Sequence, residues 1–133
     1  MIVLDASALL AFLQDEPGAD KVAGAIAARA CICSVNLAEV LSKRSDLGED
    51  PDLLLAEMKS DGLLGKAGAL EVIDLTLEDS VAIAKLRKES RSLGLSLGDR
   101  ACLALSQRLN VAVFTADRAW LKLSIGISIE AIR

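Results

Sequence analysis

Residues 2–13, Ile-Val-Leu-Asp-Ala-Ser-Ala-Leu-Leu-Ala-Phe-Leu, contain one predicted strand followed directly by one predicted helix. The apolar, β-branched run Ile2–Asp5 is typical of a buried strand, and Ser7–Leu13 is typical of a short helix. The acid Asp5 falls where the chain leaves the strand. A strand followed by a helix is the repeating unit of a parallel α/β fold.

The same alternation continues along the chain. Two capping-box pairs, Thr76 with Asp79 and Ser96 with Asp99, mark helix starts, and Pro17 fits the first turn of another helix. Strands separated by helices predict a parallel sheet with right-handed crossovers and helices on both faces. The four further strands are predicted at Cys31–Ser34, Glu71–Leu75, Val111–Thr115 and Ile127–Ala131. The helices are predicted to begin near Pro17, Val35, Pro51, Thr76, Ser96 and Ala116.

Composition limits the class of protein. The chain has 133 residues, 53% of them hydrophobic, which predicts one globular domain over residues 1–133. It contains no histidine, which excludes Ser-His-Asp and Cys-His sites, histidine acid–base chemistry and imidazole-bound zinc. The cysteines Cys31, Cys33 and Cys102 lie in apolar segments and are expected to pack as small hydrophobes in a reducing compartment. No secretory signal or membrane-length apolar run is evident, so we expect a cytoplasmic protein.

Four carboxylates fall at the predicted carboxyl edge of the sheet, where open α/β sheets carry their functional sites. Asp5 ends the first strand, and Glu39 lies in the helix after the second. Asp99 lies in the first turn of the helix before the fourth strand, and Asp117 follows that strand. Clustered carboxylates resist joint ionisation, which a Mg²⁺ or Mn²⁺ ion with oxygen ligands would relieve. The accompanying uncharged polar residues are Ser7, Ser34, Asn36, Ser96 and Thr115.

Each acid also has a purely structural interpretation. Asp5 could end a strand in a turn, and Glu39 could pair with Lys43 one helical turn away. Asp99 and Asp117 could cap helices. Only their joint placement at one edge favours a metal site. Without these four acids the chain carries equal numbers of acidic and basic residues, against a net charge of −4 with them. Asp74, near the end of the third strand, remains a possible alternative site residue.

Four motifs contain these residues: Asp5-Ala-Ser-Ala-Leu-Leu, Ser34-Val-Asn-Leu-Ala-Glu-Val, Leu95-Ser-Leu-Gly-Asp-Arg-Ala-Cys-Leu-Ala and Thr115-Ala-Asp-Arg-Ala-Trp. Together they resemble the PIN-domain family, and in particular the VapC toxins of bacterial type II toxin–antitoxin pairs. The resemblance covers essentially the whole chain and implies a three-layer α/β/α fold with a five-stranded parallel sheet in the order 3-2-1-4-5. It implies a metal-dependent endoribonuclease with Asp5, Glu39, Asp99 and Asp117 as its acids and with Ser7, Asn36 and Thr115 in support.

The resemblance further implies a homodimer, an RNA substrate and a small antitoxin that blocks the active site and carries a DNA-binding segment. Asp5, Asp99 and Asp117 are expected to hold one or two Mg²⁺ or Mn²⁺ ions, with Glu39 as a further ligand or as a base that positions water. Hydrolysis by a metal-activated water predicts 5′-phosphate and 3′-hydroxyl ends. The acidic balance argues against a general electrostatic grip on RNA, so a local groove is needed. Its expected lining is Arg87, Arg91, Arg100 and Arg118.

Three alternatives stay open at this stage. A receiver-like signalling domain is also a parallel α/β fold with an acidic Mg²⁺ pocket, and Asp74 could be its phosphoacceptor. It needs a lysine after the fifth strand, where the sequence has Ala131-Ile132-Arg133. A phosphatase with an aspartate nucleophile would need Asp-x-Asp, where this chain has Asp5-Ala6-Ser7. The third alternative is a non-catalytic PIN-like binding module.

Overall fold

The computed structural model describes all residues from Met1 to Arg133 and contains five strands and six α-helices. Each predicted strand is found within two residues of its expected boundaries. The segment expected as a helix at 116–121 is a 3-10 turn, η2 (Arg118–Lys122), and a second one, η1 (Arg91–Leu93), follows α5. The strands are β1 (Ile2–Leu4), β2 (Ala30–Cys33), β3 (Leu70–Ile73), β4 (Ala112–Thr115) and β5 (Ile129–Ala131). The helices are α1 (Ala6–Leu13), α2 (Ala19–Ala28), α3 (Ser34–Asp46), α4 (Pro51–Ser60), α5 (Leu77–Ser90) and α6 (Leu97–Leu109).

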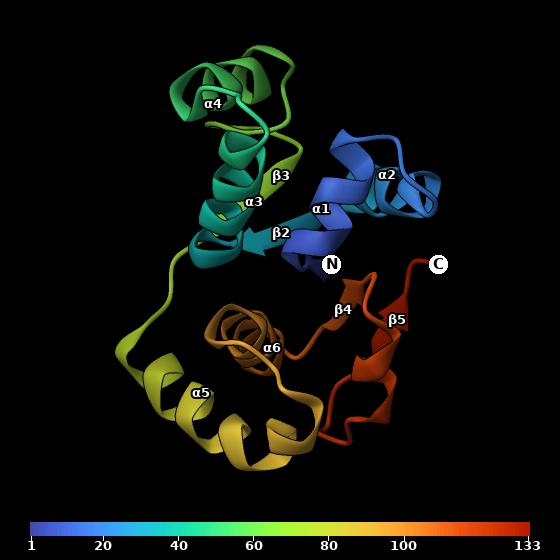
Figure 1. The fold of residues 1–133 in the computed structure, drawn as a ribbon, viewed down its shortest axis with the longest axis vertical. Helices are drawn as coiled ribbons and strands as arrows, with labels where there is room; N and C mark the ends of the chain where they lie inside the picture. The colour runs from blue at the N-terminus through green and yellow to red at the C-terminus, as the bar shows by residue number, and fades with distance from the viewer.

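The strands form one parallel sheet in the order β3-β2-β1-β4-β5, as the resemblance implied (Figure 1). The central strand β1 pairs with β2 on one side, where Leu4 lies opposite Ile32, and with β4 on the other, where Leu4 lies opposite Phe114. The carboxyl ends of β1, β2 and β4 therefore lie together, and the next residues of the chain share one edge of the sheet.

Alternate side chains of the strands enter two separate cores, which makes the fold three-layered. Leu4, Ile32 and Phe114 pack under α1, α2, α3 and α4. Val3 and Val113 pack on the opposite face under α5, α6 and η2, where Cys31, Cys33 and Cys102 are also buried as free thiols. This confirms the hydrophobic role expected for the cysteines, and burial raises the pKa of each thiol.

Side-chain caps fix where several helices begin. Asp5 caps α1 by accepting a hydrogen bond from the backbone N–H of Ala8, and Asp50 caps α4 in front of Pro51. Both expected capping boxes are formed, by Thr76 with Asp79 and by Ser96 with Asp99. These caps matter for function because two of them, Asp5 and Asp99, use acids of the predicted site.

The sheet order also decides between the alternatives. A receiver-like fold has the order 2-1-3-4-5, which places its third strand in the centre of the sheet. Here β3 is an edge strand, so Asp74 lies at the edge, exposed, with its carbonyl accepting a hydrogen bond from Arg108. The receiver-like alternative is therefore wrong. None of the helices is both long and apolar enough to cross a bilayer.

Candidate active site

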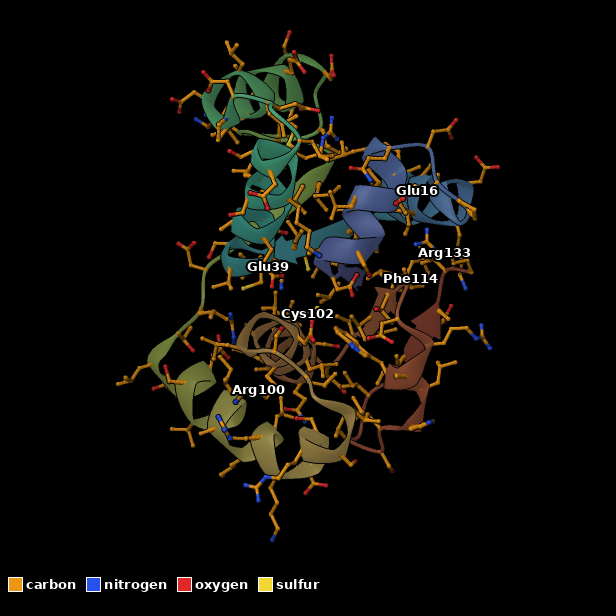
Figure 2. The ribbon with its side chains drawn as sticks, in the orientation of Figure 1. Glu16, Glu39, Arg100, Cys102, Phe114 and Arg133 are labelled. Carbon is orange, nitrogen blue, oxygen red and sulfur yellow. The ribbon has the colours of Figure 1, made fainter.

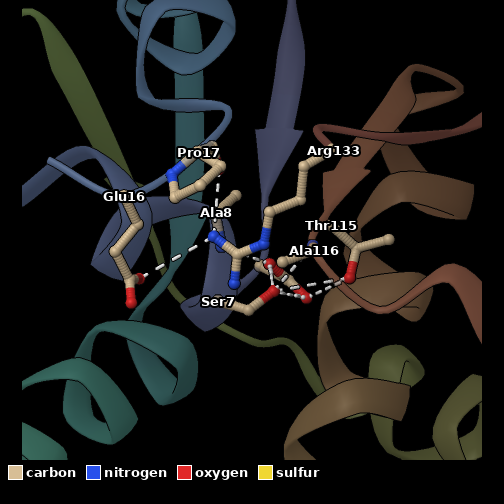
Figure 3. Close-up of polar contacts among 8 residues, drawn as sticks. Ser7, Ala8, Glu16, Pro17, Thr115, Ala116 and Arg133 are labelled. Atoms are coloured by element: carbon tan, nitrogen blue, oxygen red, sulfur yellow. Dashed lines mark hydrogen bonds and ion pairs between the residues drawn. The ribbon is translucent and has the colours of Figure 1, made fainter. Parts of the chain in front are cut away.

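Asp5 is the most buried acid of the predicted site, with 5% of its surface exposed at the end of β1. The hydroxyl of Ser7 donates to Oδ1 at 2.7 Å and lies 2.8 Å from Oδ2, and the hydroxyl of Thr115 donates to Oδ2 at 2.6 Å. The backbone N–H of Ala8 donates to Oδ1 at 2.7 Å. Figure 3 shows Ser7, Ala8 and Thr115 lying close together. Two chain segments more than a hundred residues apart thus fix its orientation.

Burial sets the charge state of Asp5. Desolvation raises its pKa from 3.8 to about 6, although the hydrogen bonds from Thr115, Ser7 and Ala8 act in the opposite direction. The negative charge of Asp99 raises the pKa further. No lysine or arginine forms an ion pair with Asp5. A desolvated carboxylate that has hydrogen bonds but no cationic partner is suited to receive a metal ion.

Glu39 lies in α3, the helix that directly follows β2. Figure 2 shows Glu39 at the end of α3 nearest to α6. Asn36, one turn earlier, donates from Nδ2 to Oε2 of Glu39 at 3.0 Å and to the carbonyl of Gly98 at 2.9 Å. A side chain at position 98 would displace Glu39, because a Cβ there would lie 2.6 Å from Cδ of Glu39. The Glu39 carboxylate therefore lies directly against the first turn of α6.

Asn36 departs from the sequence interpretation. The sequence spacing of Asn36, Glu39 and Lys43, three and four residues apart, predicts that they share one face of α3, away from its core side. The structure buries Asn36, with 1% exposed, and its Oδ1 atom has no hydrogen-bond partner. The first turn of α3 packs against α6, so the polar face of the helix is enclosed at this end and open only further along, at Lys43.

Asp99 and Asp117 complete the acidic edge. Oδ2 of Asp99 accepts the backbone N–H of Ser96 at 3.0 Å, and its effect on the pKa of Asp5 shows that the two charges interact. Asp117 is exposed and its Oδ1 accepts the N–H of Ala119 at 3.0 Å, while its own N–H donates to Oγ1 of Thr115 at 3.0 Å. Thr115 thus joins the loop of Asp117 to Asp5.

The four carboxylates share one edge but do not converge. No three acidic or thiol side chains of the chain are grouped as ligands around one point. In Glu39, Asp99 and Asp117 one oxygen is held by the protein and the other accepts no hydrogen bond from it. The chemistry of the donor set fits Mg²⁺ or Mn²⁺, which take carboxylate oxygens together with water and phosphate oxygens. Binding would require the free oxygens to approach one another.

The sequence matches the PIN domain over residues 2–125. The chain belongs to the PIN domain family. This confirms the resemblance drawn from the four motifs. No curated protein sequence matches the chain closely enough to count as a relative.

Solved structures similar to this PIN domain include three complexes with antitoxins or DNA. A DNA-bound VapBC complex from Salmonella typhimurium has a TM-score of 0.71 and 19% identity, with 99% of this chain and 98% of that chain covered. A toxin–antitoxin complex from Klebsiella pneumoniae has a TM-score of 0.73 and 15% identity, with 100% and 98% covered. VapBC2 from Rickettsia felis, bound to a promoter DNA fragment, has a TM-score of 0.72 and 18% identity, with 98% of each chain covered. At these identities the likeness shows the fold.

The arginines expected to line a groove in this PIN domain separate into two places. Arg87, Arg91 and Arg100 line one cavity beside the start of α6. Arg118 lies apart from them, in η2, where it donates to the carbonyl of Arg133 at 3.2 Å. The structure thus brings three of the four arginines expected in the groove into one cavity and leaves Arg118 outside it.

Sequence reasoning missed two features of the site. The first is Gly98, whose missing side chain admits the Glu39 carboxylate; the motif around Asp99 contains it, but nothing in one sequence gives it that role. The second is Arg133, which follows β5 and donates to the carbonyl of Pro17 at 3.0 Å, with the carboxylate of Glu16 at 3.9 Å. Figure 3 shows this contact next to Ser7. No spacing rule connects the two ends of the chain.

Proposed function

We propose that this PIN domain is a metal-dependent endoribonuclease and the toxin of a type II toxin–antitoxin pair. The observation that carries the proposal is the desolvated carboxylate of Asp5, fixed by Ser7 and Thr115 and without a cationic partner, beside three further carboxylates. Several structures of the same fold are named as toxin–antitoxin complexes, which supports the toxin assignment.

The residues divide the chemistry between them. Asp5, Asp99 and Asp117 would hold a Mg²⁺ or Mn²⁺ ion, which when bound activates water and stabilises negative charge on a phosphodiester. Ser7 and Thr115 keep the Asp5 carboxylate oriented and favour its ionised form by donating to it. Glu39, held by Asn36 against Gly98, is a further ligand or the base that orients the attacking water.

Because the chain has no histidine, water is favoured over the 2′-hydroxyl of RNA as the nucleophile. No imidazole is available to deprotonate the 2′-hydroxyl of RNA, whereas the acidic edge can bind and orient water. Water therefore attacks the phosphorus and the 3′ oxygen leaves. The products carry 5′-phosphate and 3′-hydroxyl ends.

The partners follow from the same proposal. An antitoxin would cover the acidic edge and supply the DNA-binding segment, so that this chain contacts DNA only indirectly. The toxin would act in the cytoplasm as a homodimer. Size-exclusion chromatography with light scattering tests the dimer, and co-expression with a small reading frame adjacent to the gene tests the antitoxin.

Digestion of a structured RNA tests the activity. We expect cleavage by the wild-type protein in Mg²⁺ or Mn²⁺, none in EDTA, and none by Asp5→Asn in either condition. Arg29→Gln, at the opposite edge of the sheet, is the control for preparation and folding. If RNA binds but is never cut under any of these conditions, the chain is a non-catalytic binding module.

A further inference from the structure

A cavity of about 210 Å³ is lined by residues from the end of α5, from η1 and from the start of α6. Figure 1 shows α5 and α6 next to each other in the fold. Three arginines line the cavity and no acidic residue does. This is unusual for a chain with a net charge of −4. The six lining residues are Arg87, Ser90, Arg91, Gly94, Leu95 and Arg100.

Arg100 is the buried member of this cluster, with 8% of its surface exposed. Its Nη1 donates to the carbonyl of Ile83 at 3.0 Å, which directs the side chain from α6 towards α5 (Figure 2). Its Nε atom is buried and has no hydrogen-bond partner. A buried guanidinium with one neutral acceptor is under-satisfied, and an anion in the cavity would supply the missing acceptors.

The other two guanidinium groups also lack an anion. Arg87 and Arg91 are exposed, are spaced four residues apart, and form no ion pair with any carboxylate. Like charges at this spacing repel one another. Four of the eight arginines in the chain do lie within 4.0 Å of a carboxylate, namely Arg29, Arg44, Arg108 and Arg133. None of the three cavity arginines is among them.

We propose that Arg87, Arg91 and Arg100 form a binding site for a phosphate group of the RNA backbone, separate from the phosphodiester that is cut. Guanidinium groups match phosphate oxygens with pairs of charge-assisted hydrogen bonds. Arg100 directly follows Asp99 in α6, so the site adjoins the acidic edge. The site gives an acidic protein a local grip on RNA. That the phosphate belongs to RNA rests on the proposed function, whereas the affinity for phosphate as such does not.

Nuclear magnetic resonance of the arginine Nε–H groups tests the site directly. The Arg100 signal is assigned by its loss in Arg100→Lys, and the wild-type protein is titrated in EDTA with inorganic phosphate and with a single-stranded RNA. We expect both ligands to shift the Arg100 signal with saturation, and phosphate to compete with RNA. A signal that neither ligand moves would overturn the site. A response to phosphate but not to RNA would overturn the assignment to RNA.

A matched pair of surface variants tests the contribution to RNA binding. Arg91→Gln and Arg29→Gln each remove one positive charge from an exposed position, and neither requires a buried group to repack. Measured by fluorescence anisotropy in EDTA, Arg91→Gln should weaken RNA binding about tenfold. It should also reduce the slope of log affinity against log salt by about 0.7, the value for one phosphate on single-stranded nucleic acid. Equal affinity and slope for the two variants would contradict the proposal.

These measurements are independent of cleavage because EDTA removes the metal ion. If the protein fails to cut RNA but binds it through Arg91, the nuclease proposal fails and this site stands. If the protein cuts RNA but Arg91→Gln and Arg29→Gln bind it alike, this site fails and the nuclease proposal stands.

Discussion

The Glu39 carboxylate occupies the space that a side chain at position 98 would need: a Cβ on Gly98 would lie 2.6 Å from Cδ of Glu39. Asn36 fixes this approach by donating to both Glu39 and the Gly98 carbonyl. The first turn of α6 is thus shaped around an acid from α3. This places Glu39 beside Asp99, which follows Gly98 in the chain.

Gly98→Ala therefore displaces the Glu39 carboxylate while leaving the fold intact. Glu39 is the flexible partner and can move, and alanine favours a helix over glycine by about 1 kcal/mol, so we expect thermal stability at or above that of the wild type. RNA cleavage should fall on the order of tenfold, less than the roughly 10²–10⁴-fold that a positioned general base contributes, because Glu39 is displaced and not removed. Gly24→Ala, in α2 with open space around it, is the control and should cleave normally. Full activity of Gly98→Ala would contradict the role of Glu39.

The raised pKa of Asp5 makes stability depend on pH. A folded-state pKa of about 6 against 3.8 means that protonation stabilises the fold fully below about pH 4 and that this contribution is lost as pH rises through 6. Asp5→Asn removes the charge. In EDTA at pH 8 it should be more stable than the wild type by about 3 kcal/mol, and this difference should disappear by about pH 4. Urea unfolding across this range measures it. A stability difference for Asp5→Asn that stays constant across this pH range would refute the burial argument.

Asp99 serves as both a cap and a charge facing Asp5, and Asp99→Asn separates the two roles. If Asp99 is only a helix cap, loss of its charge at the helix N-terminus should lower the free energy of unfolding by about 0.3–1 kcal/mol, with or without metal. Because it also repels Asp5, we expect Asp99→Asn to melt at the same or a higher temperature than the wild type in EDTA. It should also lose the stabilisation that excess Mn²⁺ gives the wild type. If Asp99→Asn is less stable than the wild type in EDTA, yet is stabilised by Mn²⁺ as much as the wild type, Asp99 is not a ligand.

An ion pair between Asp79 of α5 and Arg108 of α6 holds the two helices together. Arg108 lies in the last turn of α6, at the opposite end of that helix from Asp99. Burial opposes ionisation of Asp79, but the hydrogen bonds from Thr76 and Arg108 outweigh it and lower its pKa. Arg108→Gln leaves this buried carboxylate without its ion pair and should destabilise the protein by about 2 kcal/mol at pH 7. The difference should shrink as pH falls from 3.8, the ordinary pKa of an aspartate, through the lowered pKa that Asp79 has in the folded protein. The exposed Lys88→Gln should be neutral, and equal stability of the two variants would disprove the pairing.

Local patterns predicted the strands and helix starts because those features depend on neighbouring residues. The capping pairs at Thr76 and Ser96 and the strand ending at Asp5 needed no knowledge of distant segments. The order of the strands came from the resemblance of four motifs, since periodicity does not specify which strands pair.

The rest depends on contacts between distant segments. The burial of Asn36, the space at Gly98 and the inward direction of Arg100 are all set by helices that pack together from different parts of the chain. Arg118 was grouped with the other arginines because charge in a sequence carries no direction. The sequence likewise predicted four acids at one edge, but not that separate hydrogen bonds hold each of them and that the four do not converge.

The chemistry of the RNA ends tests the central claim most directly. A single-stranded RNA is incubated with the wild-type protein in Mg²⁺, and the fragments are examined for 5′-phosphate and 3′-hydroxyl groups by ligation and by mass spectrometry. The account predicts both groups on every product and no product with Asp5→Asn. Fragments ending in 2′,3′-cyclic phosphate, or cleavage that persists in EDTA, would contradict it.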